Sequence, residues 1–99
     1  MKLGRTIGRV VLSKRDANLA GGFLLVVAPL SKSQIADLGD ASVSRDQPNL
    51  VVYDTLGSRS GDVISYVEGA EATAPFGSPV PIDACSVGIV DSVNYKPNA

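Results

Sequence analysis

The acidic side chains are the residues of this sequence whose types come nearest to a recognisable chemistry. Paired carboxylates can exchange protons with a substrate or bind a hard cation such as Ca²⁺. The acidic residues considered for such a role are Asp54, Asp62, Glu68, Glu71, Asp83 and Asp91. Their spacing matches neither a calcium-binding loop nor a catalytic dyad. We therefore interpret them as turn residues, hydrogen-bond acceptors at strand ends and interface charges.

Histidine is absent from the sequence, and its absence removes much of ordinary enzyme chemistry. A Ser-His-Asp or Cys-His nucleophile, a histidine general base and every histidine metal ligand are impossible. The single cysteine, Cys85, lies in an apolar run and is expected to be a small core residue and not a nucleophile. We expect no catalytic residue, no cofactor and no metal site, and the chain is predicted not to be an enzyme.

The glycine-rich segment 56–61, Leu-Gly-Ser-Arg-Ser-Gly, could bind a phosphate through its backbone amides. It lacks the Lys-Ser or Lys-Thr pair and the following helix of a phosphate-binding loop. A tight turn with positive φ at Gly57 or Gly61 is therefore the favoured interpretation.

Arg5 and Arg9 stand four residues apart in an expected strand, so both side chains should lie on the same face. In a nucleic-acid-binding protein they would contact phosphates. The nine basic and ten acidic residues give a net charge of −1, which favours an exposed or intersubunit pair instead.

The elements that must position these residues are short apolar, β-branched runs separated by turn residues. The predicted strands are 2–13, 23–28, 50–55, 62–68 and 82–91, with short helical turns within 33–38 and 69–73. The segment 31–49 is expected to be a surface excursion, and the prolines of 75–81 a rigid approach to the last strand. Gly88, inside that strand, indicates a bend, a bulge or a close approach, and we favour a barrel corner or a neighbouring subunit there.

The chain of 99 residues predicts one domain, residues 1–93, followed by a loose tail, residues 94–99. No apolar run approaches the roughly 20 residues of a membrane helix, and the N-terminus lacks the apolar core of a secretion signal. We expect a soluble, intracellular protein that does not bind a membrane.

The strand pattern predicts an all-β fold, a small five-stranded Greek-key barrel resembling the OB-fold. Such barrels often bind single-stranded nucleic acid through surface aromatics on a basic face. The aromatic residues are Phe23, Tyr53, Tyr66, Phe76 and Tyr95, most of them where a core would need them. The runs 23–28 and 82–90 are apolar on both faces, and one small domain does not easily cover both.

Four segments together resemble the EutN/CcmL family of bacterial microcompartment vertex proteins, found in carboxysomes and in ethanolamine-utilisation and related shells. The segments are the opening Met-Lys-Leu-Gly-Arg-Thr-Ile-Gly-Arg-Val-Val, residues 22–30 ending in Pro29-Leu30, residues 54–63, and residues 81–91, Pro-Ile-Asp-Ala-Cys-Ser-Val-Gly-Ile-Val-Asp. They stand in the family's order and spacing, so the resemblance extends from Met1 to about Val93.

The resemblance implies a structural subunit of a microcompartment shell in the cytoplasm, assembled as a ring, usually of five, that caps a vertex beside hexameric shell proteins. Candidate subunit-interface residues are Arg5, Arg9, Gly57, Ser58, Arg59, Gly88 and Asp91, and candidate pore-lip residues are Gly69, Ala70 and Glu71. Where the family often has Gly-Ser-Ser-Ala-Arg, this chain has Gly-Ala-Glu-Ala-Thr at 69–73, which predicts an acidic pore lip. An OB-like nucleic-acid binder and a small ligand-binding barrel or enzyme remain the alternatives.

Overall fold

The computed structural model describes residues 1–19, 21–39, 47–73 and 81–95, and for Ala70 and Glu71 it describes the backbone alone. The elements are β1 Lys2–Val10, η1 Ala17–Leu19, β2 Phe23–Pro29, α1 Lys32–Ala36, β3 Leu50–Asp54, β4 Val63–Glu68, η2 Gly69–Ala72 and β5 Ala84–Ile89. Each predicted strand is present, and the predicted helical turns are confirmed as α1 and η2. The first strand is shorter than predicted, because it ends at Val10 and not at residue 13.

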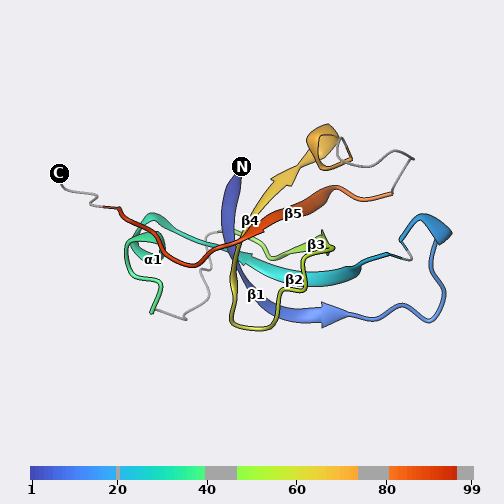
Figure 1. Ribbon diagram of the computed structural model, residues 1–99, viewed down its shortest axis with the longest axis horizontal. Helices are drawn as coiled ribbons and strands as arrows, with labels where there is room; N and C mark the ends of the chain where they lie inside the picture. The colour runs from blue at the N-terminus through green and yellow to red at the C-terminus, as the bar shows by residue number, and fades with distance from the viewer. Residues whose placement is uncertain (20, 40–46, 74–80, 96–99) are drawn as a thin grey trace.

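The strands close into a barrel in the order β1-β2-β3-β5-β4 (Figure 1). Neighbouring strands are antiparallel, except that β3 and β5 run parallel where Tyr53 pairs with Cys85. Since β5 lies between β3 and β4, the chain must cross over as it does in a Greek key. The predicted all-β, five-stranded, OB-like barrel is confirmed for the described residues.

A bulge in β1 changes the face on which its second half presents side chains. Thr6 pairs with Val27 and Gly8 with Val26, so one extra residue, Ile7, lies between the two pairs. Because side chains alternate along a strand, an extra residue reverses the faces of all residues that follow. The prediction that Arg5 and Arg9 lie on the same face is therefore wrong.

A second bulge lies in β5, where Ser65 of β4 pairs with Gly88 and Tyr66 pairs with Ser86. The extra residue is Val87, directly before Gly88. A Cβ atom built on Gly88 would lie 2.9 Å from Ser65 Oγ. A bulge, one of the meanings given to this glycine, is thus present within the chain, and the favoured barrel corner or neighbouring subunit at Gly88 stays a prediction.

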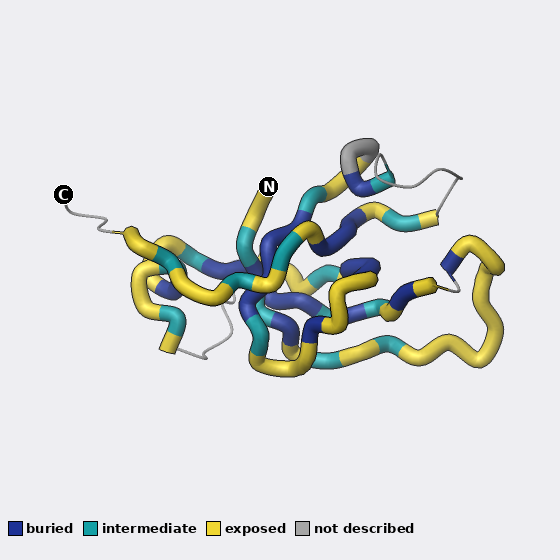
Figure 2. Tube along the Cα trace, viewed as in Figure 1, coloured by how far each residue is buried: buried dark blue, intermediate teal, exposed yellow. Residues whose placement is uncertain are grey.

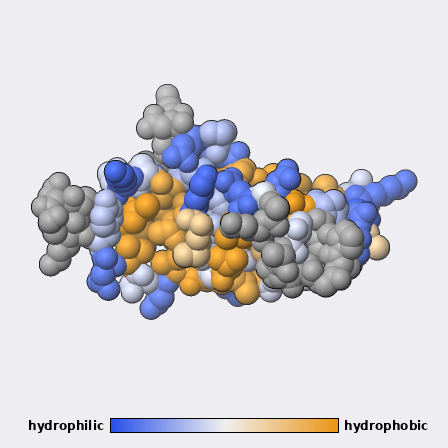
Figure 3. Space-filling view, turned by 90° about the horizontal axis from the view of Figure 1, so that it is seen from above, coloured by the Kyte–Doolittle hydropathy of each residue, from blue (hydrophilic) through white to orange (hydrophobic). Residues whose placement is uncertain are grey.

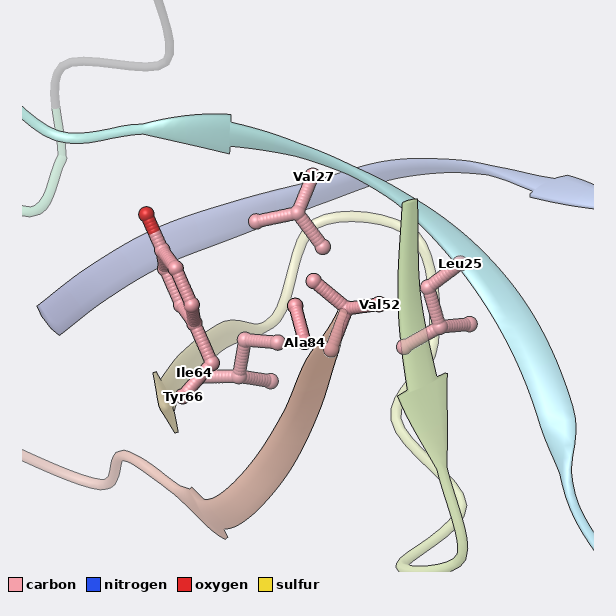
Figure 4. Packing of buried hydrophobic residues seen from close by; sticks show 6 residues of the cluster. All are labelled: Leu25, Val27, Val52, Ile64, Tyr66 and Ala84. Carbon is pink, nitrogen blue, oxygen red and sulfur yellow. The ribbon is translucent and has the colours of Figure 1, made fainter. Parts of the chain in front are cut away.

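The hydrophobic core lies inside the barrel (Figure 4) and consists of Leu25, Val27, Val52, Ile64, Tyr66 and Ala84. The buried residues lie mostly in the strands, in the second halves of β2 and β3 and the first halves of β4 and β5, and the described connections around them are mostly exposed (Figure 2). At Gly4 a side chain would overlap Val27 Cγ1 and come within 3.0 Å of Tyr66 Cε1. Glycine at this position lets β1 pass close to the core.

Some predictions fall outside the described residues. These are part of the surface excursion, residues 40–46, most of the proline segment, residues 74–80, and the end of the tail, residues 96–99. No helix in the described part of the chain is long and apolar enough to cross a membrane.

Candidate functional site

Asp54, the last residue of β3, is the centre of a buried polar network. Its carboxylate is 0% exposed, and its Oδ2 accepts hydrogen bonds from the amides of Gly57 and Ser58, both at 2.9 Å. Its Oδ1 accepts from the Leu56 amide at 3.3 Å and from Ser86 Oγ at 2.5 Å. The expectation that an aspartate serves as a strand-end acceptor is confirmed here.

Hydrogen bonds to the charged form decide the pKa of Asp54. Burial acts to raise this pKa, but the donors, first Ser86 and then the amides of Ser58, Leu56 and Gly57, together hold the pKa below its ordinary value of 3.8. The carboxylate is therefore ionised at neutral pH and anchors the chain that follows β3.

That chain, the 55–62 loop, is fixed at its middle and far end as well. Ser58 is buried, and its Oγ lies 2.9 Å from Oγ1 of the buried Thr6. The Asp62 Oδ2 accepts from the Arg59 amide at 2.8 Å, and the Gly61 amide donates to the Thr6 carbonyl at 2.8 Å. Positive φ values of 88° at Gly57 and 97° at Gly61 confirm the predicted turn, so the loop presents Arg59 from a fixed backbone.

Arg5 has partners within its own chain, on the face opposite Arg9. Its Nη1 donates to the Gly61 carbonyl at 2.7 Å and its Nη2 to the Leu38 carbonyl at 2.5 Å. These bonds tie β1 to the 55–62 loop and to the segment after α1. The structure therefore gives Arg5 an internal structural role, and its part in a subunit interface stays a prediction.

Arg9 and Arg59 line one pocket, together with Ser58 and Ser60. The Arg9 guanidinium carbon lies 4.6 Å from the centroid of the Phe23 ring, a cation–π contact. Of the candidate interface residues, the structure thus brings Arg9, Ser58 and Arg59 together. Asp91 is exposed beyond the end of β5, and Gly88 is half-buried within that strand.

Cys85 is buried, and its Sγ donates to the Ser86 carbonyl at 3.2 Å. Burial, and then the charge of Asp54, raise the pKa of this thiol above its ordinary value. The thiol is therefore protonated at neutral pH, and the expectation that Cys85 is a core residue is confirmed. Among the described residues, no group of three metal-ligating side chains is placed to hold a metal ion.

The outward-facing side of β1, β2 and β3 is apolar. Of these strands, the sequence predicts incomplete cover only for the run 23–28, and it does not point to Val10 or Val51. The outer sheet face is defined as the incompletely covered residues of this side, Val10, Leu24, Val26 and Val51, placed side by side by the pairs Val10–Leu24 and Val26–Val51. Beside them Tyr53, which pairs with Leu24, is buried against Leu19. Val51 is 49% exposed and the other members are half-buried.

The inward residues of β2, Leu25 and Val27, are fully covered, whereas on its outward side Ala28 is buried and Leu24 and Val26 are half-buried. Within one chain the outward side of this strand is therefore incompletely covered.

A separate apolar area belongs to the face that carries the N-terminus and β5 (Figure 3). Val87 and Ile89 on β5 are 44% and 45% exposed, and Met1 is almost fully exposed. The last predicted strand is thus also incompletely covered within one chain. The signal for both areas is in the sequence, as apolar runs with no polar face, but the bulges decide which residues are left outside.

The candidate pore-lip residues lie in η2, directly after β4. Gly69 has a φ of +70°, and its amide donates to the Asp83 carbonyl at 2.7 Å. This bond fixes the start of the turn to the segment before β5. The side chains of Ala70 and Glu71 are outside the described part of the structure, so the predicted acidic lip stays a prediction.

Comparison with known proteins places this geometry in one family. The family model described as "Ethanolamine utilisation protein EutN/carboxysome" matches residues 1–91. The chain is 38% identical over 94 residues to the bacterial microcompartment shell vertex protein GrpN of Rhodospirillum rubrum (strain F11), covering 94% of this chain and 96% of that protein. It is 32% identical over 94 residues to the shell vertex protein EutN of Salmonella typhimurium (strain LT2), covering 94% and 86%.

Solved structures agree. The GrpN pentameric microcompartment shell protein from Rhodospirillum rubrum superposes with a TM-score of 0.75 at 34% sequence identity, covering 97% of this chain and 100% of that one. The matches extend over nearly the whole of each chain, so they include the barrel, the 55–62 loop and the outer sheet face. The chain belongs to the EutN/CcmL family.

Proposed function

We propose that this chain is a structural subunit of a bacterial microcompartment shell in the cytoplasm, and that five copies form a ring that caps a shell vertex. Its relatives named as shell vertex proteins, and a solved relative named as pentameric, support this proposal. The chain has no histidine, and the buried thiol and carboxylate described above are occupied in structural roles. The proposed function is therefore structural and depends on contacts between subunits.

The incomplete cover of the outer sheet face is the observation that carries the proposal. Val26 and Val51 form a pair of β-branched side chains on a regular strand surface that another subunit can pack against. A cyclic ring needs two different surfaces on each subunit, because every contact joins one surface to a different one on the neighbour. The outer sheet face and the exposed end of β5 supply two such surfaces.

Five-fold symmetry follows from the geometry of a closed shell. Hexagonal tiles alone form a flat sheet, and a polyhedron requires five-fold positions at its vertices. We infer that the outside of the ring contacts hexameric shell proteins. The candidate interface residues are divided between two roles, since Ser58 and Gly57 shape the 55–62 loop and Arg59 is exposed on it.

Co-expression with a hexameric shell protein tests the vertex role. We expect closed polyhedral particles by electron microscopy when this chain is present, and sheets or open tubes when it is omitted. A Val26→Asp, Val51→Asp variant is the matched control, because it should fold but not form the ring. Closed particles that form equally well without this chain would rule out the vertex function.

We also propose that residues 69–71 lie near the ring axis, where five copies of Glu71 would form an acidic lip. The bond from the Gly69 amide to Asp83 supports a fixed position for this turn. The test is a nitroxide label on Glu71→Cys, with Lys32→Cys on α1 as the control position. We expect shorter label-to-label distances within the ring at 71 than at 32, and equal or longer distances at 71 would contradict the axial position.

A further inference from the structure

The pocket between β1, β2 and the 55–62 loop gathers cationic and hydroxyl groups. Its lining residues are Thr6, Gly8, Arg9, Leu25, Ser58, Arg59 and Ser60, and its volume is about 240 Å³. Arg9, Arg59 and Ser60 are exposed, whereas Thr6, Leu25 and Ser58 are buried. The pocket thus has a closed inner wall and a rim that can donate hydrogen bonds.

The guanidinium of Arg9 and the backbone of Arg59 are held in place, and neither guanidinium has an anionic partner among the described residues. Arg9 is held at the Phe23 ring, and the backbone of Arg59 is held by Asp62 on both sides, through Oδ2 at 2.8 Å and the Asp62 amide at 3.0 Å. Within the described part of the chain, neither guanidinium forms a salt bridge. Two like charges at one pocket repel each other, and a bound anion would remove that repulsion.

The carboxylates built into this part of the structure are already engaged. Asp54 is fully buried and accepts hydrogen bonds at both oxygens, and Asp62 Oδ2 accepts from the Arg59 amide. The Ser60 hydroxyl makes no hydrogen bond to another described residue and is free to donate. The donors at the rim therefore lack an acceptor within the described structure.

We propose that Arg9, Arg59 and Ser60 form a binding site for a carboxylate. Guanidinium groups bind carboxylates through paired, charge-assisted hydrogen bonds, and a hydroxyl adds a third donor. The carboxylate has two possible sources, a free organic anion or an acidic side chain of a neighbouring copy. The second source rests on the proposed ring and the first does not.

Thermal unfolding of the purified, assembled protein tests the site, with sodium malonate as the probe and sodium chloride at equal ionic strength as the reference. Arg9→Gln and Arg59→Gln remove the rim charges, and Lys32→Gln on α1 removes a charge elsewhere. If the source is a free anion, malonate raises the midpoint of the unchanged protein by about 4 °C or more. That rise persists in Lys32→Gln and is lost in both arginine variants.

If the source is a neighbouring copy, malonate has no specific effect. Arg59→Gln then raises the dissociation constant of the ring by about tenfold or more, and Lys32→Gln does not. Two results would overturn the site. The first is that malonate has no effect and that the ring of Arg59→Gln dissociates like that of Lys32→Gln. The second is that malonate stabilises Arg59→Gln as much as it stabilises the unchanged protein. A chain that is monomeric throughout would contradict the ring, and the malonate titration would still test the site.

Discussion

The 55–62 loop and the outer sheet face differ in how completely a single subunit satisfies their side chains and backbone. The loop is rich in glycine and serine, yet Ser58 is buried and the Asp54 carboxylate holds the loop backbone through hydrogen bonds within the chain. The outer sheet face is regular and apolar, yet Val51 is half exposed. The polar loop has its hydrogen bonds satisfied within one subunit, whereas the apolar sheet face leaves hydrophobic surface exposed in one subunit.

The difference separates two kinds of stability. Removing a member of the buried network leaves polar groups without partners in the single subunit, so the free energy of unfolding decreases. Changing the outer sheet face removes few contacts within one subunit, so the change should weaken the association of subunits and not their folding. Single substitutions in the two regions should therefore separate a loss of folding stability from a loss of assembly.

Replacing Asp54 with alanine should be the most damaging of these changes. The amides of Leu56, Gly57 and Ser58 and the Ser86 hydroxyl would lose their acceptor in a buried position. We expect the free energy of unfolding to fall by about 3 kcal/mol. Urea unfolding at one fixed protein concentration measures this.

The matched control for Asp54 is Asp37→Ala, because Asp37 is exposed and, among the described residues, its carboxylate accepts a hydrogen bond from the Gly39 amide alone. This control should cost less than about 1 kcal/mol. Equal losses for the two aspartates would show that the network around Asp54 is not a special source of stability.

Replacing Ser58 with alanine should cost less, about 1–2 kcal/mol, because it leaves one buried hydroxyl, that of Thr6, without its partner. The double change Thr6→Val, Ser58→Ala removes both hydroxyls. We expect the double variant to be more stable than the sum of the single changes predicts. Strict additivity would mean that the two hydroxyls do not interact.

Lowering the pH should reduce the free energy of unfolding through the protonation of Asp54. The pKa of this carboxyl is lower in the folded chain than its ordinary value of 3.8, so the unfolded chain binds the proton more tightly. The stability that Asp54 contributes is present above pH 3.8 and is lost as the pH falls through the folded-state pKa. Comparing the pH dependence of unfolding with that of Asp54→Asn should show a flatter acid limb for the variant. Identical acid limbs would contradict the lowered pKa.

Replacing Val51 with serine should have the smallest effect on folding, about 0.5 kcal/mol or less, since this side chain is 49% exposed. The same change should raise the dissociation constant of the ring, because it removes apolar surface from the proposed contact. Dilution followed by light scattering measures the assembly. A loss of folding stability as large as that of Ser58→Ala would mean that the outer sheet face already serves the single subunit.

The barrel could be predicted from the sequence because its signals are local. Short β-branched runs and the turn glycines Gly57 and Gly61 mark strands and loops wherever they occur. The bulge at Ile7 could not be predicted, since it depends on how β1 aligns with β2. The bulge at Val87 was indicated by Gly88 only as one of several meanings. Without the first bulge, Arg9 would lie on the same face as Arg5 and away from Arg59.

The candidate site was predictable in part for the same reason. Asp54 was expected to accept hydrogen bonds at the end of a strand, and it does. Ser58, a serine in a glycine-rich turn, gives no sign in the sequence that it is buried against Thr6. The exposure of Val51 likewise depends on what covers β3 in space, which the order of residues along the chain does not state.

If another copy covers the outer sheet face, the purified protein should have the mass of a ring in solution, which native mass spectrometry over a range of concentrations can measure. We predict a species of five copies that persists on dilution and that gives way to single copies in the Val26→Asp, Val51→Asp variant. A wild-type chain that remains a single copy at every concentration would contradict this cover of the outer sheet face.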